Sequence, residues 1–154
     1  MTREVPDELN EFLTAFPPEV ISSYLATRAE VLKLAPQANE LIYDAYNALS
    51  IAYSFTENLK QGFIHIAAYA KHVNLGFNQG ATLPDPGNLL QGNGTRIRHI
   101  KIRNQQTLQN PAAISLIKLA ILQGEALAAE VSSARPVKGR SFVKSISPNK
   151  RRPN

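Results

Sequence analysis

The sequence has 154 residues and a formal net charge of +5, and this length favours one domain with a self-sufficient hydrophobic core. The absence of cysteine excludes a disulfide framework, a thiolate zinc site and a cysteine nucleophile, and favours a cytoplasmic location. The first twelve residues lack the apolar segment of a signal peptide, and no apolar run reaches the roughly 18 residues of a membrane span, so we expect a soluble protein without membrane contact.

The first predicted element is a helix over residues 18–35. Apolar residues recur there at helical spacing, Pro17 and Pro18 stand at its start, and Pro36 follows its end. Stretches with alternating or β-branched residues come next, at residues 40–46, 48–56, 62–70 and 72–77. Short polar segments separate these stretches. The pattern predicts four consecutive antiparallel strands.

The glycine-rich segment DPGNLLQGNGT, residues 85–95, looks at first like a phosphate-binding loop. A P-loop needs Gly-Lys-Ser/Thr at its end, whereas Gly92 is followed by Asn-Gly. A dinucleotide fingerprint would need a third glycine where the chain has Ile97, and a helix after it. We therefore interpret the segment as a connection, with a short helical turn that starts at Asp85 and ends at Gly92.

Residues 96–103, RIRHIKIR, alternate cleanly and predict a fifth strand. Pro111 then opens a long apolar helix that continues to about residue 131 despite Gly124 in its interior. Successive hairpins with helices at both ends are typical of an α+β fold. We expect a single antiparallel sheet of about five strands with the helices on one face.

The basic charge lies mainly in the tail, residues 135–154. These residues hold seven of the 17 basic side chains and none of the 12 acidic ones, so the body keeps ten basic and 12 acidic groups and a net charge of −2. The tail is rich in Pro, Ser and Gly and has few apolar residues. We expect a folded domain over residues 1–134 and a disordered tail whose removal leaves the fold intact.

The alternation within the strands assigns side chains to two faces of the sheet. Apolar residues such as Ile64, Ile66 and Ile100 are expected to face the helices, which leaves polar residues on an open face. This surface is the candidate ligand site, because neutral imidazoles bind transition metals and protonated ones beside cations bind anions. Its predicted members are His65, Tyr69, His72, Asn74, His99, Lys101 and Arg103.

Three segments resemble the YdhG-like family of bacterial domains, most of which have unknown function. They are APQANELIYDAY, FIHIAAYAKHVNLGF and LPDPGNLLQGNGTRIRHIKI; with the apolar final helix, the resemblance covers about two thirds of the chain. It implies a frataxin-like fold, and because the family includes a frataxin-like intracellular iron chaperone, it also implies iron binding at an acidic ridge. The matching acids here are scattered rather than clustered, at Glu19, Glu30, Glu40 and Asp44.

Signals of catalysis are weak in this sequence. It has no Gly-x-Ser-x-Gly nucleophile elbow and no HExxH, DxD or EF-hand spacing. We therefore expect an accessory protein that binds a small ligand or a metal without catalysis, with no bound cofactor except the iron that the resemblance implies. The alternative is a nucleic-acid-associated module that attracts phosphates through its tail. The tail residues for this role are Arg140, Lys144, Lys150, Arg151 and Arg152.

Overall fold

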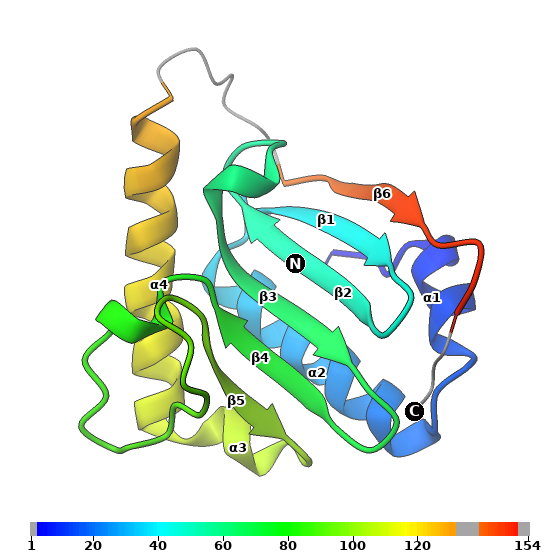
Figure 1. The fold of residues 1–154 in the computed structure, drawn as a ribbon, viewed down its shortest axis with the longest axis horizontal. Coiled ribbons are helices and arrows are strands. Elements are labelled where there is room, and N and C mark those ends of the chain that lie inside the picture. The colour runs from blue at the N-terminus through cyan, green and yellow to red at the C-terminus, as the bar shows by residue number, and fades with distance from the viewer. Residues whose placement is uncertain (1–2, 132–138, 151–154) are drawn as a thin grey trace.

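Six strands form one mixed sheet in the computed structural model, which describes residues 3–131 and 139–150 (Figure 1). The strand order is β5-β4-β3-β2-β1-β6, and all neighbours are antiparallel except β1 and β6, which are parallel. The strands are β1 (Asn39–Asp44), β2 (Leu49–Ser54), β3 (Gly62–Ala68), β4 (Val73–Phe77), β5 (Arg98–Ile102) and β6 (Ser141–Ile146).

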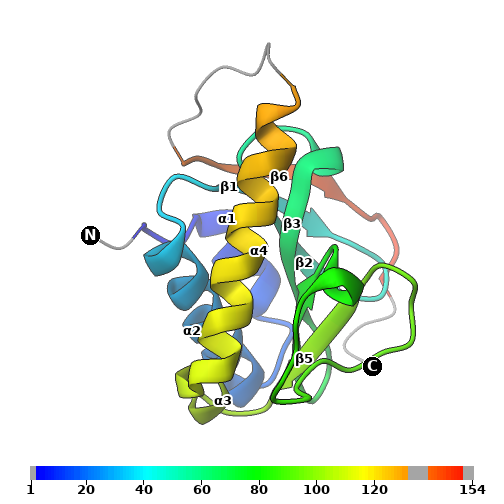
Figure 2. The same cartoon turned by 90° about the vertical axis from the view of Figure 1, so that its left-hand side faces the viewer.

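The helices lie on one face of this sheet (Figure 2). The two long helices, α2 and α4, both contact β3, while no helix of the described residues lies on the opposite face (Figures 1 and 2). The α-helices are α1 (Asp7–Leu13), α2 (Pro18–Leu34), α3 (Gln106–Gln109) and α4 (Pro111–Ala129), and the 3₁₀ turns are η1 (Leu59–Gln61) and η2 (Gly80–Thr82). The α+β class predicted from the sequence is confirmed.

The hydrophobic core fills the space between the helices and the sheet. Proline at the start of α2 and of α4 fixes both helices where the sequence predicts them. The strand residues assigned to the helix side by alternation are buried there, which confirms that assignment. They are Leu49, Ile51, Tyr53, Ile64, Ile66, Ala68, Val73, Leu75, Phe77, Ile100 and Ile102. Phe55 is partly buried and packs against this cluster.

Gly124 lets α4 approach the sheet closely. A Cβ atom at this position would lie only 2.2 Å from the ring of Phe63 on β3, so only glycine fits without a rearrangement. The Phe63 ring also stacks on Phe55, with ring centroids 4.9 Å apart. The helix-weakening glycine in the middle of α4 therefore has a packing function.

The predicted connection at residues 85–95 is present, but the helical turn expected at its start is not formed. The carboxylate of Asp85 instead accepts hydrogen bonds from the backbone N–H groups of Leu89 and Leu90, both at 2.9 Å. Gly92 has the positive φ that the sequence predicts for it, +103°, although no helical turn precedes it. The segment is a turn held by an acidic side chain, which is unsuited to cradling a phosphate.

Two sequence predictions about the sheet are wrong. The sheet is mixed instead of antiparallel, and the sixth strand, β6, comes from the tail that we expected to be disordered. β6 is ordered by the edge of β1: the Glu40 N–H donates to the Arg140 carbonyl at 2.8 Å, and the Arg140 N–H donates to Asn39 Oδ1 at 2.9 Å. The expected boundary after residue 134 and the last four residues fall outside the described ranges.

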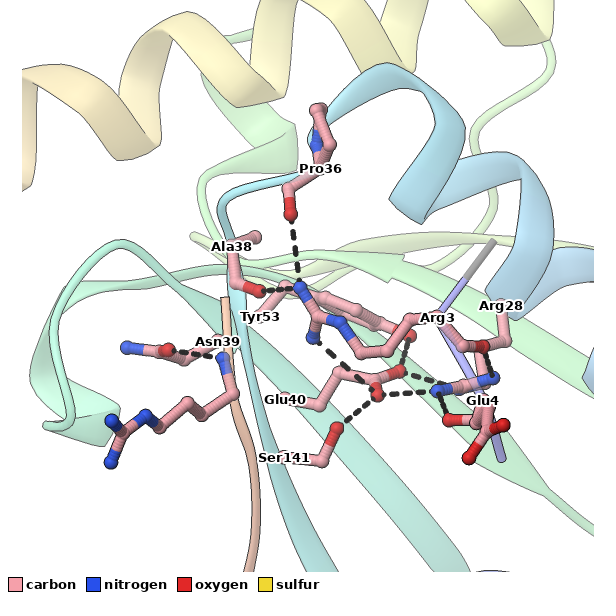
Figure 3. Close-up of polar contacts among 10 residues, drawn as sticks. Arg3, Glu4, Arg28, Pro36, Ala38, Asn39, Glu40, Tyr53 and Ser141 are labelled. Atoms are coloured by element: carbon pink, nitrogen blue, oxygen red, sulfur yellow. Dashed lines mark hydrogen bonds and ion pairs between the residues drawn. The ribbon is translucent and has the colours of Figure 1, made fainter. Parts of the chain in front are cut away.

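A buried ionic cluster ties the chain segments together at the β1–β6 edge (Figure 3). Arg28 of α2 donates two hydrogen bonds to the Glu40 carboxylate, at 2.8 and 2.9 Å. Tyr53 and Ser141 each donate a hydroxyl to Glu40 at 2.7 Å, and Arg3 lies 3.6 Å from it. Burial, followed by the neighbouring Glu40 carboxylate, raises the pKa of Tyr53, so this phenol remains a donor.

Deletion of residues 139–154 is predicted to destabilise the fold. The deletion removes a whole strand and one hydrogen-bond donor to buried Glu40, which should cost about 2 kcal/mol or more and lower the melting temperature by about 5 °C or more. Thermal unfolding followed by circular dichroism measures the effect. A control that lacks only residues 151–154 should melt like the full chain, and equal melting of all three proteins would show that β6 contributes nothing.

The Glu40→Gln variant tests the buried cluster. Neutralising the carboxylate leaves the Arg28 guanidinium buried without its counter-charge, so we expect a loss of about 3 kcal/mol in the free energy of unfolding. Urea denaturation of the variant beside the wild type gives this value. The matched control is Glu19→Gln on exposed α2 surface, which should change stability by less than about 0.5 kcal/mol.

Candidate functional site

The strand register brings the predicted open-face residues of β3, β4 and β5 into adjacent rows. His65 lies opposite Gly76, and Gly76 lies opposite His99, so two of the three histidines share one row across the sheet. In the next row Asn74 lies opposite Lys101. These strands turn this face toward the viewer in Figure 1, away from α2 and α4.

His65 is fixed in the row by its neighbours. A Cβ atom on Gly76 would lie 2.0 Å from His65 Nε2, so the imidazole ring covers the backbone of β4 at the one residue without a side chain. His65 Nδ1 and Asn78 Oδ1 are 2.9 Å apart. With the amide oxygen facing it as an acceptor, Nδ1 carries the proton, which leaves the lone pair on Nε2, the ring nitrogen that lies over Gly76.

The hairpin between β3 and β4 holds the third histidine. The Tyr69 N–H donates to the His72 carbonyl at 3.0 Å, and the two rings stack with centroids 5.1 Å apart. Arg103 follows the last residue of β5 and is exposed. Two histidines thus share a row on β3 and β5, and the third, His72, lies at the β3–β4 hairpin.

All three imidazoles favour their neutral form. Burial lowers the pKa of His65, although the hydrogen bond to Asn78 acts in the opposite direction. Burial and then the charges of Lys101 and Arg103 lower the pKa of His72, and burial and then Lys101 lower that of His99. The positive charge of this face at neutral pH therefore comes from lysine and arginine.

The carboxylates that the family resemblance implies for a metal site do not form one exposed ridge. Glu40 lies in the buried ionic cluster, and Asp44 is buried and pairs with Lys150. Glu19, in contrast, lies on exposed surface of α2. In the part of the chain that the structure describes, no group of three or more His, Cys, Asp or Glu side chains could hold a metal ion.

The basic tail residues contact the body of the protein. Lys144 Nζ lies 3.4 Å from the Glu57 carbonyl, and Lys150 pairs with Asp44 while its ammonium group lies 5.8 Å from the centre of the Phe12 ring. Arg140 uses its backbone to bind β1. The remaining two, Arg151 and Arg152, fall outside the described residues.

Sequence reasoning missed a hollow of about 250 Å³ beside the open face. It lies where η1, the end of β4 and the approach to β5 meet α4. Asn78, the partner of His65, is part of its wall, which connects the two features. Its lining includes Leu59, Lys60, Asn78, Gln79, Arg96, Ile97 and Leu127. The sequence offered one signal for it, because Lys60 and Arg96 stand in connections next to apolar residues.

Comparisons with known proteins add no family to these observations. No family model matches the chain, and no curated protein or solved structure shows significant similarity to it. Helix α4 is long and apolar enough to cross a membrane by length and composition, but the same property is common in core helices of soluble proteins. The function therefore has to be argued from the geometry.

The lowered pKa of His65 predicts a pH dependence of stability. In the unfolded chain the pKa returns to about 6.5, so between the two values the unfolded chain binds more protons. The stability that neutral His65 contributes to the folded protein is fully present above about pH 6.5. It is lost as the pH falls toward the pKa of His65 in the folded protein. Urea unfolding should therefore show lower stability at about pH 5.5 than at about pH 7.5.

The His65→Gln variant provides the comparison for this pH effect. Glutamine does not titrate, so the difference in stability between the two pH values should shrink relative to the wild type. A difference that is unchanged in the variant would assign the pH dependence to other groups.

Proposed function

We propose that the protein is a non-catalytic accessory protein that binds a small anionic ligand on the open face of β3, β4 and β5. The observation that carries this proposal is the set of adjacent rows in which His65, His99 and Lys101 project from neighbouring strands. Antiparallel sheets with one uncovered face offer a rigid platform, and rigid elements hold binding groups more accurately than loops do.

The charge of this region supports an anion as the ligand. Residues 58–110 contain six lysines and arginines and a single acid, Asp85. The Asp85 carboxylate is engaged by two backbone N–H groups of its own turn. An approaching anion therefore meets lysine and arginine side chains without a competing free carboxylate in this part of the chain.

Two alternatives from the sequence remain proposals. Iron or another metal, which the YdhG-like resemblance implies, would use the free imidazole nitrogens, and its binding would strengthen as the pH rises. Nucleic-acid binding through the tail has less support, because Lys144 and Lys150 already contact the protein itself. The three ligand classes differ in their pH and salt dependence, so one series of titrations separates them.

The test is a titration of ¹⁵N-labelled protein with pyrophosphate, with zinc and ferrous ions, and with a short oligonucleotide, followed by NMR. We expect pyrophosphate to shift the imidazole signals of His65, His72 and His99. The double variant Lys101→Gln/Arg103→Gln should bind it about tenfold more weakly, because two charge-assisted contacts are lost. The control is Lys33→Gln on α2, a cation exposed on the helix side, which should bind like the wild type.

Each outcome selects one function. Metal binding without a pyrophosphate response would replace the anion site with a histidine metal site. Oligonucleotide binding that weakens steeply with salt and disappears on removal of residues 151–154 would favour the tail. The proposed site would be refuted if none of the three imidazole signals shifted in any titration. It would also be refuted if the double variant and the control bound pyrophosphate with equal affinity.

A further inference from the structure

Helix α4 exposes a stripe of residues on its outer side, in which Leu122 is the one large hydrophobic residue that is exposed and Ile121 is half-buried. The helix crosses the front of the molecule in Figure 2 with no other element over its middle. Leu122 lies at the centre of this side and is 61% exposed, more than any other large hydrophobic residue in the described chain. The buried residues of this long helix are Ala113, Leu116, Ile117, Ala120 and Gly124, although its composition is that of a core helix. The fold therefore leaves the outer side of α4 uncovered around Leu122.

Two opposite charges frame the centre of the stripe. Lys118 and Glu125 are both exposed, and their spacing of seven residues places them on the same side of the helix. Neither side chain has a hydrogen bond or an ion pair within the described residues. The midpoint between them falls between Ile121 and Leu122, each charge being about 5 Å from it along the helix axis.

This arrangement is self-complementary. If a second α4 lies antiparallel to the first with a twofold axis at the midpoint, each Lys118 faces the Glu125 of the other copy. The same symmetry places each Ile121 against the Leu122 of the other copy. An isologous dimer needs one surface that matches its own rotated copy, and the stripe meets this requirement in both apolar and charged positions.

We propose that α4 is the interface of a homodimer, in which a second copy of the chain packs antiparallel on the stripe formed by Lys118, Ile121, Leu122 and Glu125. The close contact between Gly124 and Phe63 holds α4 against β3, so the stripe is presented on a rigid element. The open face of the sheet lies on a different side of the molecule (Figures 1 and 2). Dimerisation therefore leaves the proposed ligand site accessible.

A membrane is a less suitable partner for this surface. A helix that lies on a membrane carries its cations at the edges of the apolar stripe, where they reach the lipid headgroups. In α4, a lysine and a glutamate lie within the stripe itself. A lipid bilayer offers neither of them a partner, whereas a second copy of α4 pairs both.

Charge reversal followed by sedimentation velocity tests the dimer. The wild type should show a monomer–dimer equilibrium as its concentration rises to about 100 µM, with a dimer of twice the 16.9 kDa chain mass. Lys118→Glu and Glu125→Lys should each weaken the dimer about tenfold or more, because each brings like charges together. The double variant carrying both substitutions restores opposite charges and should regain most of the affinity. Leu122→Gln should be monomeric.

The chain offers a second, independent readout because it contains no cysteine. Leu122→Cys lies beside the twofold axis and should form a disulfide-linked dimer on mild oxidation, whereas Ser115→Cys, farther from the axis, should not. Circular dichroism confirms that each variant is folded. A wild type that stays monomeric, a double variant without recovery, or a monomer that binds vesicles of anionic phospholipid would each overturn the proposal.

Discussion

The buried pair of Glu40 and Arg28 is the constraint on which the architecture depends. A carboxylate without solvent access is costly unless every lone pair has a donor; here three segments donate hydrogen bonds to Glu40, and Arg3 of a fourth adds an ion pair at 3.6 Å. The N-terminal residues, α2, β2 and β6 must all reach their places before the charge is fully compensated. The pair therefore selects one arrangement of these segments, which apolar packing alone would specify less strictly.

The ionisable groups also differ between the two edges of the sheet. At the β1–β6 edge, ionisable side chains such as Glu40 and Asp44 form contacts inside the protein. The strands at the other edge, β3 to β5, keep their imidazoles and cations on the uncovered face. Structural charge and surface charge are thus located in different parts of one sheet, so a ligand on the open face does not compete with the contacts that hold the fold.

Local patterns were sufficient to predict the parts of the fold that depend on neighbours in sequence. Proline placement located α2 and α4, and alternation located β1 to β5 and the face to which His65 and His99 belong. The sixth strand could not be predicted in this way, since the hydrogen bonds that order it come from the edge of β1. Likewise, Glu40 and Asp44 read as solvated acids in the sequence, and only their distant partners Arg28 and Lys150 identify them as buried. The hollow at Asn78 is formed by three connections and α4 together, so the sequence of any one segment could not predict it.

The parallel pairing of β6 with β1 has a consequence for the order in which the protein is made. The Ser141 hydroxyl and the Glu40 carboxylate that it contacts are separated by 101 positions in the chain. During synthesis, β1 leaves the ribosome long before β6 does, and contacts of high sequence separation are slow to form. Until then the nascent sheet presents the edge of β1 to its surroundings. An unpaired strand edge can pair with strands of other chains, so the newly made protein is open to aggregation until β6 docks.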